Sequence, residues 1–331
     1  MRAIPLVPLL LSGWLALPVS VHADDAQDQL KRLAQAEQQQ SFQGTFVYER
    51  NGSFSTHKIW HRVADGKVSE RLLQLDGSAQ EVLRVNGVTQ CVSASLEAGV
   101  SNIPDSPTHA FDAAKLSGWY DIKVAGASRV AGRPATIVTL TPRDQHRYGI
   151  ELHLDNQTGL PLKSLLLSDK GQLLERFQFT ELDTAGQLTD QMLQPGGDCK
   201  AVVAAKSRSE PVKPQSAWHS DWLPTGFELS SAEVHKDPDS NTLVTSLMYD
   251  DGLARFSVFI EPVSEAAVTD IRTQLGPTAA VSRRLTTDKG DAMVTVVGEI
   301  PIGTAERIAL SMRSDADTAA ANQQPKATIQ Q

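Results

Sequence analysis

Aromatic residues, cysteines and long apolar runs are all scarce in this 331-residue chain. Aromatic side chains make up 5% of it, and there are two cysteines. Beyond the N-terminal segment, no apolar run approaches the roughly 20 residues that a membrane-spanning helix needs. The sequence also lacks a nucleophile elbow, a phosphate-binding loop, an H-E-x-x-H motif and a dinucleotide-binding fingerprint. These absences argue against the common classes of enzyme and against a bound metal or cofactor, and they favour a binding protein.

The first residues are typical of a secretory signal peptide. Arg2 is followed by an apolar stretch from Ile4 to Leu17, and Val21-His22-Ala23 places small residues at positions −3 and −1 of a cleavage site. We therefore expect a signal peptide at 1–23 and a soluble, exported mature chain.

The charge balance is acidic. The formal net charge is −8, from 31 Lys and Arg against 39 Asp and Glu. Removal of residues 1–23 takes away Arg2 alone, which leaves 30 against 39 and a net charge of −9. Nucleic-acid binding needs clustered positive charge, so no nucleic-acid partner is expected.

The two cysteines leave two alternatives open. A Cys91–Cys199 disulfide would be favoured by an oxidising compartment and would close a loop of about 100 residues, with up to roughly 4.7 kcal/mol of chain-entropy stabilisation. Alternatively, Cys91 is a buried sheet residue and Cys199 an unrelated thiol. A redox-active C-x-x-C motif is absent.

The segment 24–182 predicts one helix followed by a long series of antiparallel strands. Residues 25–40 have helical apolar spacing. Asn-Gly or Asp-Gly pairs, typical of tight hairpin turns, then occur at 51–52, 65–66, 76–77 and 86–87. Ser101 to Pro107 is irregular, and a short helix is expected around Phe111 to Leu116. Further turns bring the total to about ten strands, a number that favours curling into a barrel or splitting into a sandwich.

A cavity inside this sheet and a solid two-layer core are both consistent with the pattern. Leu72-Leu73 and Val82-Leu83 break strict alternation and place apolar groups on both faces. Aromatic residues gather in the first hairpins, where core packing is their usual role. The candidates for a cavity lining are Phe46, Tyr48, Trp60, Leu73 and Leu75.

A second, smaller domain follows a change of composition. Residues 183–217 are rich in Gly, Gln, Pro, Lys and Ser and predict a linker that acts as a hinge. Residues 218–313 predict a small α+β domain with five strands, a helix near 270–275 and a second helix at 305–312. The tail 314–331 is expected to be disordered.

Two polar patterns carry little chemistry. His57 and His61 have metal-chelating spacing only in a helix, and in a strand they lie roughly 13 Å apart. Asp250-Asp251 falls in a predicted turn, where both side chains are expected to be solvated.

Several segments together resemble the MucB/RseB family. In the second domain these are WLPTGF at 222–227, YDDGL at 249–253, FSVF at 256–259 and VTVVGEIP at 294–301. In the first they are LLQLDG at 72–77 and motifs scattered over 148–177. The resemblance extends over essentially the whole mature chain, in the same order.

This resemblance implies an α+β fold with a large, unclosed antiparallel β-barrel around helices, as in lipoprotein carriers, plus the smaller α+β domain. It further implies a periplasmic negative regulator of the envelope-stress and alginate-controlling sigma factor. Such a regulator binds the periplasmic domain of a membrane-spanning anti-sigma factor of the MucA/RseA type, shields it from regulated proteolysis, and is released by lipid or lipopolysaccharide. It is peripheral to the inner membrane through that partner.

Candidates for partner contact are Trp218, Trp222, Tyr249 and Phe256. The alternative function is a periplasmic carrier or chaperone of lipoproteins or lipids, although such carriers normally lack a second domain. The oligomeric state, a homo-oligomer included, remains open.

Overall fold

The computed structural model describes residues 23–77, 80–93, 112–202, 216–237, 241–263, 270–288 and 290–315. The predictions for residues 1–22, for the irregular stretch at 101–107, for the middle of the linker and for nearly all of the C-terminal tail lie outside these ranges.

The larger domain contains two α-helices, a 3-10 helix and eleven strands in the described part of the chain. The helices are α1 (Ala23–Gln39), α3 (Ala113–Leu116) and the 3-10 helix η1 (Asp190–Leu193). The strands are β1 (Phe42–Arg50), β2 (Ser53–Ala64), β3 (Lys67–Gln74), β4 (Glu81–Val85), β5 (Val88–Ser93), β6 (Tyr120–Val130), β7 (Arg133–Pro142), β8 (Gly149–Asp155), β9 (Pro161–Leu167), β10 (Leu173–Asp183) and β11 (Cys199–Ala201).

These strands form one antiparallel sheet that does not close. Its order is β11-β5-β4-β3-β2-β1-β10-β9-β8-β7-β6, so β11 and β6 are its two edges. Hairpins connect most neighbours, and the long-range pair β1–β10 joins the two halves. At the tight turns, Asn51, Asp65 and Asn86 have positive φ and each precedes a glycine with positive φ. Three of the four pairs read from the sequence therefore form hairpin turns of the expected kind, whereas at Asp76-Gly77 only the glycine has positive φ and a longer loop joins β3 to β4.

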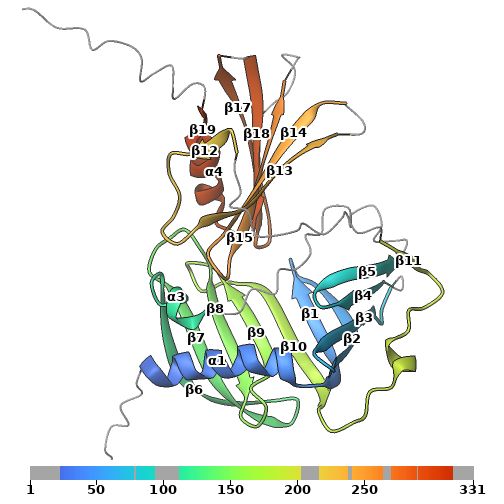
Figure 1. The fold of residues 1–331 in the computed structure, drawn as a ribbon. Coiled ribbons are helices and arrows are strands. Elements are labelled where there is room, and N and C mark those ends of the chain that lie inside the picture. The colour runs from blue at the N-terminus through green and yellow to red at the C-terminus, as the bar shows by residue number, and fades with distance from the viewer. Residues whose placement is uncertain are drawn as a thin grey trace, which may run out of the picture.

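Helix α1 packs across one face of this sheet (Figure 1). Ala26, Leu30, Leu33 and Ala36 recur every three or four residues and are at most 5% exposed. The first three lie in one core cluster with α3 and the strands β6 to β8, and Ala36 lies in the neighbouring cluster around β1 and β10. The helix thus covers one half of the sheet and ends beside β1.

The smaller domain is a six-stranded antiparallel sheet with a helix on one face (Figure 1). Its strands, in sheet order, are β13 (Glu228–Lys236), β14 (Leu243–Asp250), β15 (Arg255–Pro262), β18 (Gly290–Gly298), β17 (Thr278–Thr287) and β16 (Ile271–Leu275). Helix α4 (Ile302–Ser311) buries Ala305, Ile308 and Ala309 against this sheet. The short strands β12 (Trp218–Ser220) and β19 (Met312–Ser314) form a separate pair.

The structure corrects two predictions. The predicted helix at 270–275 is the edge strand β16, whose five side chains are all exposed, so no apolar alternation marks it. The predicted linker 183–217 is not a free connection throughout, because η1 and β11 pack on the larger domain and β11 pairs with β5. Its first half therefore belongs to the larger domain.

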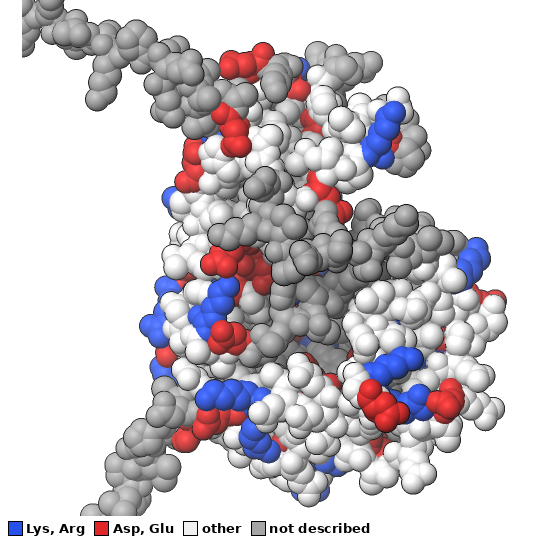
Figure 2. Space-filling model, in the orientation of Figure 1, with Lys and Arg blue, Asp and Glu red and all other residues white. Residues whose placement is uncertain are grey.

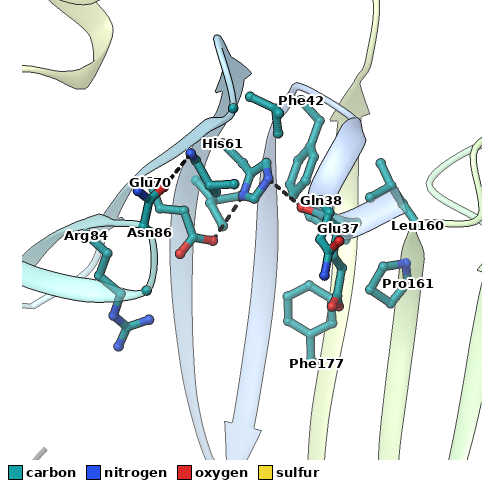
Figure 3. A pocket seen from close by; sticks show the side chains of 16 residues that line it. Glu37, Gln38, Phe42, His61, Glu70, Arg84, Asn86, Leu160, Pro161 and Phe177 are labelled. Carbon is teal, nitrogen blue, oxygen red and sulfur yellow. Dashed lines mark hydrogen bonds and ion pairs between the residues drawn. The ribbon is translucent and has the colours of Figure 1, made fainter. Parts of the chain in front are cut away.

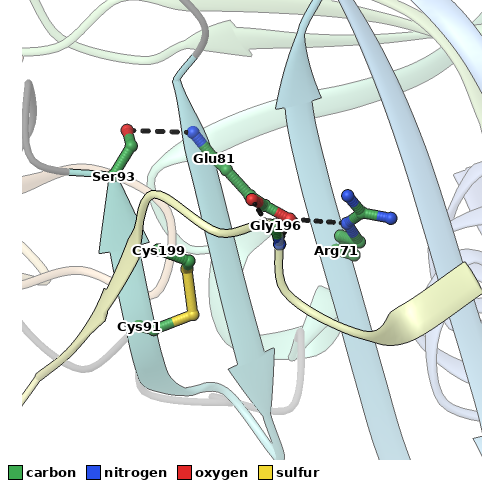
Figure 4. The surroundings of a disulfide bond; sticks show 6 residues. All are labelled: Arg71, Glu81, Cys91, Ser93, Gly196 and Cys199. Atoms are coloured by element: carbon green, nitrogen blue, oxygen red, sulfur yellow. Dashed lines mark hydrogen bonds and ion pairs between the residues drawn. A yellow bond between two sulfur atoms is a disulfide. The ribbon is translucent and has the colours of Figure 1, made fainter. Parts of the chain in front are cut away.

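Of the two cysteine alternatives, the structure has the disulfide, Cys91 to Cys199 (Figure 4). The bond joins β5 to β11. Beside it, the buried Glu81 carboxylate accepts hydrogen bonds from Gly196 N at 2.9 Å and from Arg71 Nε at 2.6 Å. The segment leading to the smaller domain is thereby fixed to the sheet at Cys199.

Candidate functional site

The larger domain contains a cavity of about 640 Å³ between the end of α1 and the sheet. That volume lies within the range of ligand pockets, roughly 300–1,000 Å³. Its apolar lining is Phe42, Ile59, Val63, Val68, Leu160, Pro161, Phe177 and Phe179, and its polar lining includes Glu37, Gln38, His61, Glu70, Arg84 and Asn86. The lining suits a ligand that has both apolar and polar parts.

One cross-strand row forms the polar floor of the cavity (Figure 3). In the strand register Phe42 lies opposite His61, His61 opposite Glu70, and Glu70 opposite Arg84. Side chains in one such row share a face of the sheet. The Arg84 guanidinium forms no hydrogen bond or ion pair with another described side chain, lines the cavity, and lies close enough to Glu70 for its charge to lower the pKa of that carboxyl.

His61 connects the floor to the end of α1. Its Nδ1 lies 3.0 Å from Glu70 Oε1 and its Nε2 lies 3.0 Å from the Glu37 carbonyl oxygen. Both ring nitrogens thus have an oxygen partner, one from the sheet and one from the helix. The hydrogen bond from His61 lowers the pKa of Glu70. The Phe42 ring stacks on His61 with centroids 4.8 Å apart.

None of the five residues predicted to line the cavity belongs to its lining. Trp60, Leu73 and Leu75 have the opposite strand parity from Ile59, His61, Val68 and Glu70, so they belong to the other face of the sheet. Trp60 contacts Lys58 and Arg71 there, and Leu75 is 50% exposed. Phe46 packs behind the cavity against Phe177, with ring centroids 4.6 Å apart. Tyr48 follows on the same face, next to Arg50.

A second feature is the contact between the two domains, which is built mainly from the loop 143–148 between β7 and β8. We call this segment the docking loop. His146 Nδ1 lies 3.1 Å from Thr304 Oγ1, and the Tyr148 hydroxyl donates to the Ile300 carbonyl at 3.1 Å. Arg147, between them, is fully buried.

Arg147 bonds to both domains at once. It donates to Asp144 in its own loop, to Asp251 Oδ2 at 2.5 Å, and to the Thr225 carbonyl at 2.6 Å. The prediction that Asp251 is solvated is wrong, because its side chain is fully buried. Its second oxygen accepts from the amides of Leu253 and Ala254, which turns the Asp-Asp-Gly segment into a fixed acceptor site.

Arg50, at the end of β1, makes a further contact between the domains. Its guanidinium pairs with Glu175 of β10 at 3.3 Å and with Glu299 of the smaller domain at 3.0 Å. It also hydrogen-bonds Thr278. Since β1 and β10 also carry Phe42, Phe177 and Phe179 of the cavity, the same two strands reach both the cavity and the domain contact.

The four candidates for partner contact fall in different environments. Tyr249 and Phe256 are 3% and 2% exposed and stack on each other in the core of the smaller domain, so they offer no surface to a partner. Trp222 lies between Arg307, 3.8 Å from its ring centroid, and His146 of the docking loop. Trp218 lines a cavity of about 350 Å³ with Leu285, Met312 and Arg313.

The described residues hold no cluster of three or more His, Cys, Asp or Glu side chains placed to bind a metal ion. Within the same ranges, no helix has the length and apolarity needed to span a membrane. On the face shown in Figure 2, acidic and basic side chains are interspersed rather than gathered into one patch.

These features define a two-domain, mostly antiparallel-sheet protein with a cavity in one domain and a buried, ion-paired contact to the other. The chain belongs to the MucB/RseB family. The family model of the MucB/RseB N-terminal domain matches residues 25–196, and that of the C-terminal domain matches residues 212–313. The α+β class and the unclosed sheet predicted from the sequence are confirmed.

Two relatives show the range of similarity. The sigma factor AlgU regulatory protein MucB of Pseudomonas aeruginosa is 58% identical over 309 residues, which cover 93% of this chain and 96% of that protein. The sigma-E factor regulatory protein RseB of Escherichia coli is 27% identical over 318 residues, covering 92% and 96%. Both are named as regulatory proteins.

Solved structures agree with this assignment. A complex of Pseudomonas aeruginosa MucA and MucB matches with a TM-score of 0.80 at 58% identity, covering 88% of this chain and 99% of that chain. MucB in complex with the periplasmic part of MucA gives 0.77 at 57% identity with the same coverage. MucB alone gives 0.66 at 56% identity, covering 88% and 98%. The fold therefore fits the two complexes better than MucB alone.

Proposed function

We propose that this chain is a periplasmic negative regulator of an extracytoplasmic sigma factor that controls envelope-stress and alginate genes. It binds the periplasmic domain of a membrane-spanning anti-sigma factor of the MucA type and shields it from regulated proteolysis. The observation that carries the proposal is the match to MucB over 93% of the chain, together with the TM-score of 0.80 to the MucA/MucB complex.

Release of the anti-sigma factor follows from a lipid or lipopolysaccharide ligand in the cavity. A ligand shifts such an equilibrium only by its difference in affinity between the free and partner-bound forms. The cavity supports this step because β1 and β10 line it at one end and reach the smaller domain through Arg50 and Glu175 at the other. An acyl chain among the aromatic residues of the cavity therefore acts on strands that also form the domain contact.

The test is co-elution of the mature chain with the periplasmic domain of a MucA-type anti-sigma factor, with and without lipopolysaccharide. We expect a complex that lipopolysaccharide dissolves and that protects the partner from its protease. No complex under any condition would refute the regulator and leave a lipid carrier.

A pair of variants separates the cavity from the rest of the surface. Val68→Trp adds an indole to the cavity lining and should keep partner binding while losing release by lipopolysaccharide. Lys67→Trp changes the adjacent exposed side chain and should behave like the unmodified chain. Equal release from both variants would exclude this cavity as the lipid site.

A further inference from the structure

The buried contact at Arg147 favours a single relative position of the two domains. The guanidinium is fully buried and hydrogen-bonds Asp144, Asp251 and the Thr225 carbonyl. The rings of Trp119, Tyr120 and Phe227 surround it at 5.9, 5.7 and 5.1 Å. A buried ion pair contributes little net stability, but loss of one partner leaves an uncompensated buried charge. Any small displacement of one domain that breaks these bonds while the charges stay buried is therefore penalised.

Each side of the contact is also held by hydrogen bonds within its own domain. Asp144 fixes Arg147 from within the docking loop through two hydrogen bonds, of 3.2 and 2.9 Å. On the other side, the amides of Leu253 and Ala254 hold Asp251 at 2.9 and 2.7 Å. Because neither charged group can follow a moving partner, the pair forms in one relative position of the domains.

Shape imposes the same position independently of charge. Gly226, next to Thr225, has φ +92° and faces the Trp119 ring so closely that an added Cβ would lie 2.6 Å from it. Only glycine fits this backbone conformation without strain and leaves room for the indole. The smaller domain thus meets the larger one through a glycine backbone packed on a tryptophan and through a buried arginine.

We propose that Arg147, Asp251 and the Gly226–Trp119 contact form a latch that holds the two domains in the arrangement the anti-sigma factor recognises. The inference rests on the proposed function and names the residues that carry its regulation. The TM-scores are 0.80 and 0.77 to the two complexes and 0.66 to MucB alone, although each comparison covers 88% of this chain. The solved structures therefore differ in how well they match this arrangement. A partner that binds the latched arrangement stabilises the latch, and the latch raises the affinity of that partner by the same factor.

Two variants of the mature full-length chain open the latch by different means. Asp251→Asn removes the charge that pairs with Arg147, and Gly226→Ala pushes Trp119 away without changing any charge. Arg133→Gln is a matched control, because Arg133 pairs with the buried Asp155 at 2.8 Å inside the larger domain alone. Lys115→Gln is a second control, because its pair with Glu228 crosses the domain contact at an exposed position and such pairs are weak.

The radius of gyration in solution and the dissociation constant for the MucA-type periplasmic fragment are measured for each folded variant. Both latch variants should increase the radius of gyration and weaken fragment binding about tenfold or more. Arg133→Gln should lower the melting temperature without changing the radius of gyration, and Lys115→Gln should change neither quantity.

The outcomes separate the latch from the proposed function. Latch variants that keep both the radius of gyration and the affinity overturn the proposal, and so does an expanded chain with unchanged affinity. If the unmodified chain fails to bind the fragment, the proposed function falls. In that case the radius of gyration alone tests the latch, and the latch is refuted if both latch variants have the same radius of gyration as the unmodified chain.

Discussion

Removal of the Cys91–Cys199 bond should lower the free energy of unfolding of the larger domain by several kcal/mol. The two residues are 108 apart in the sequence. In the chain-entropy model, closing a loop of that size removes about 16 cal/mol/K from the unfolded chain, which is about 4.8 kcal/mol at 25 °C. For a domain of this size the corresponding fall in melting temperature is roughly 10–20 °C.

The local structure makes this value an upper limit. Strand β11 has three residues and three register partners on β5, so a reduced chain can release β11 from the sheet edge. Such release also removes Gly196 from the buried Glu81 carboxylate, which would keep Arg71 as its partner. Because this relaxation stabilises the reduced native state, a measured loss of about 2–4 kcal/mol is expected.

The assay is denaturant unfolding of the mature chain with and without a phosphine reductant. The Cys91→Ala/Cys199→Ala double variant serves as the control, since it should match the reduced chain and should not respond to the reductant. Hydrogen exchange should show lost protection at the amides of Lys200 and Val202, which face β5, while α1 stays protected. A reduced chain whose free energy of unfolding changes by less than about 0.5 kcal/mol would refute the reasoning.

Three further predictions concern titration and packing. Burial raises the pKa of all four tyrosines, and that of Tyr249 to about 12. Absorbance titration of the native chain should therefore show no phenol ionising near pH 10, whereas all four should ionise there in the unfolded chain. Because only the unfolded chain ionises at that pH, the free energy of unfolding should fall as pH rises above 10. Because the pKa of Glu70 is lowered in the folded chain, its ionised carboxylate stabilises the fold above about pH 4.5, and this stabilisation is lost as pH falls through the folded pKa. His61→Ala should therefore make the free energy of unfolding, measured by denaturant titration, less dependent on pH in the acid range. Leu30→Ala should cost about 2–5 kcal/mol of unfolding free energy because Leu30 is fully buried, while Leu75→Ala at a 50% exposed site should stay within about 0.5 kcal/mol; equal losses would contradict the packing of α1.

Local signals in the sequence were sufficient for most of the fold. The Asn-Gly and Asp-Gly pairs located hairpins because Asn, Asp and Gly adopt positive φ more readily than other residues, although Ala131-Gly132 forms the same kind of turn. The strand at 271–275 was missed for the opposite reason, since an exposed edge strand has no buried face to impose alternation.

The cavity was harder to place because strands β2 and β3 carry apolar or aromatic residues on both faces. Leu72 and Leu73 are adjacent and point to opposite faces of the sheet. Whichever of them is assigned to the face that carries α1 decides whether Trp60 or His61 is assigned to that face. The polar row is a signal that composition hides, since His61, Glu70 and Arg84 become neighbours only after the strands are paired. A polar row beside apolar neighbours is a better indication of a cavity than aromatic residues, which pack tightly in most cores.

The domain contact was out of reach for a different reason. Arg147 and Asp251 are 104 residues apart, and no periodicity links a loop in one domain to a turn in the other. A turn containing Asp-Asp-Gly is usually exposed, so the sequence alone predicts solvated side chains at Asp250 and Asp251. Burial of a carboxylate requires a partner charge, and only the folded pair of domains supplies it.

The position of the cavity follows from where α1 ends. Leu30 and Leu33 fill the space over β6 to β8, and Ala36 brings the last turns of the helix to β1. The helix ends at Gln39, and the chain turns into β1 at Phe42, which stacks on His61. Past that point the sheet continues through β3 and β4, and in the described part of the chain no α-helix covers the floor at Glu70 and Arg84, whereas His61 still contacts the Glu37 carbonyl of α1. One more helical turn would place side chains where the cavity lies, so the length of α1 sets the space available to a ligand.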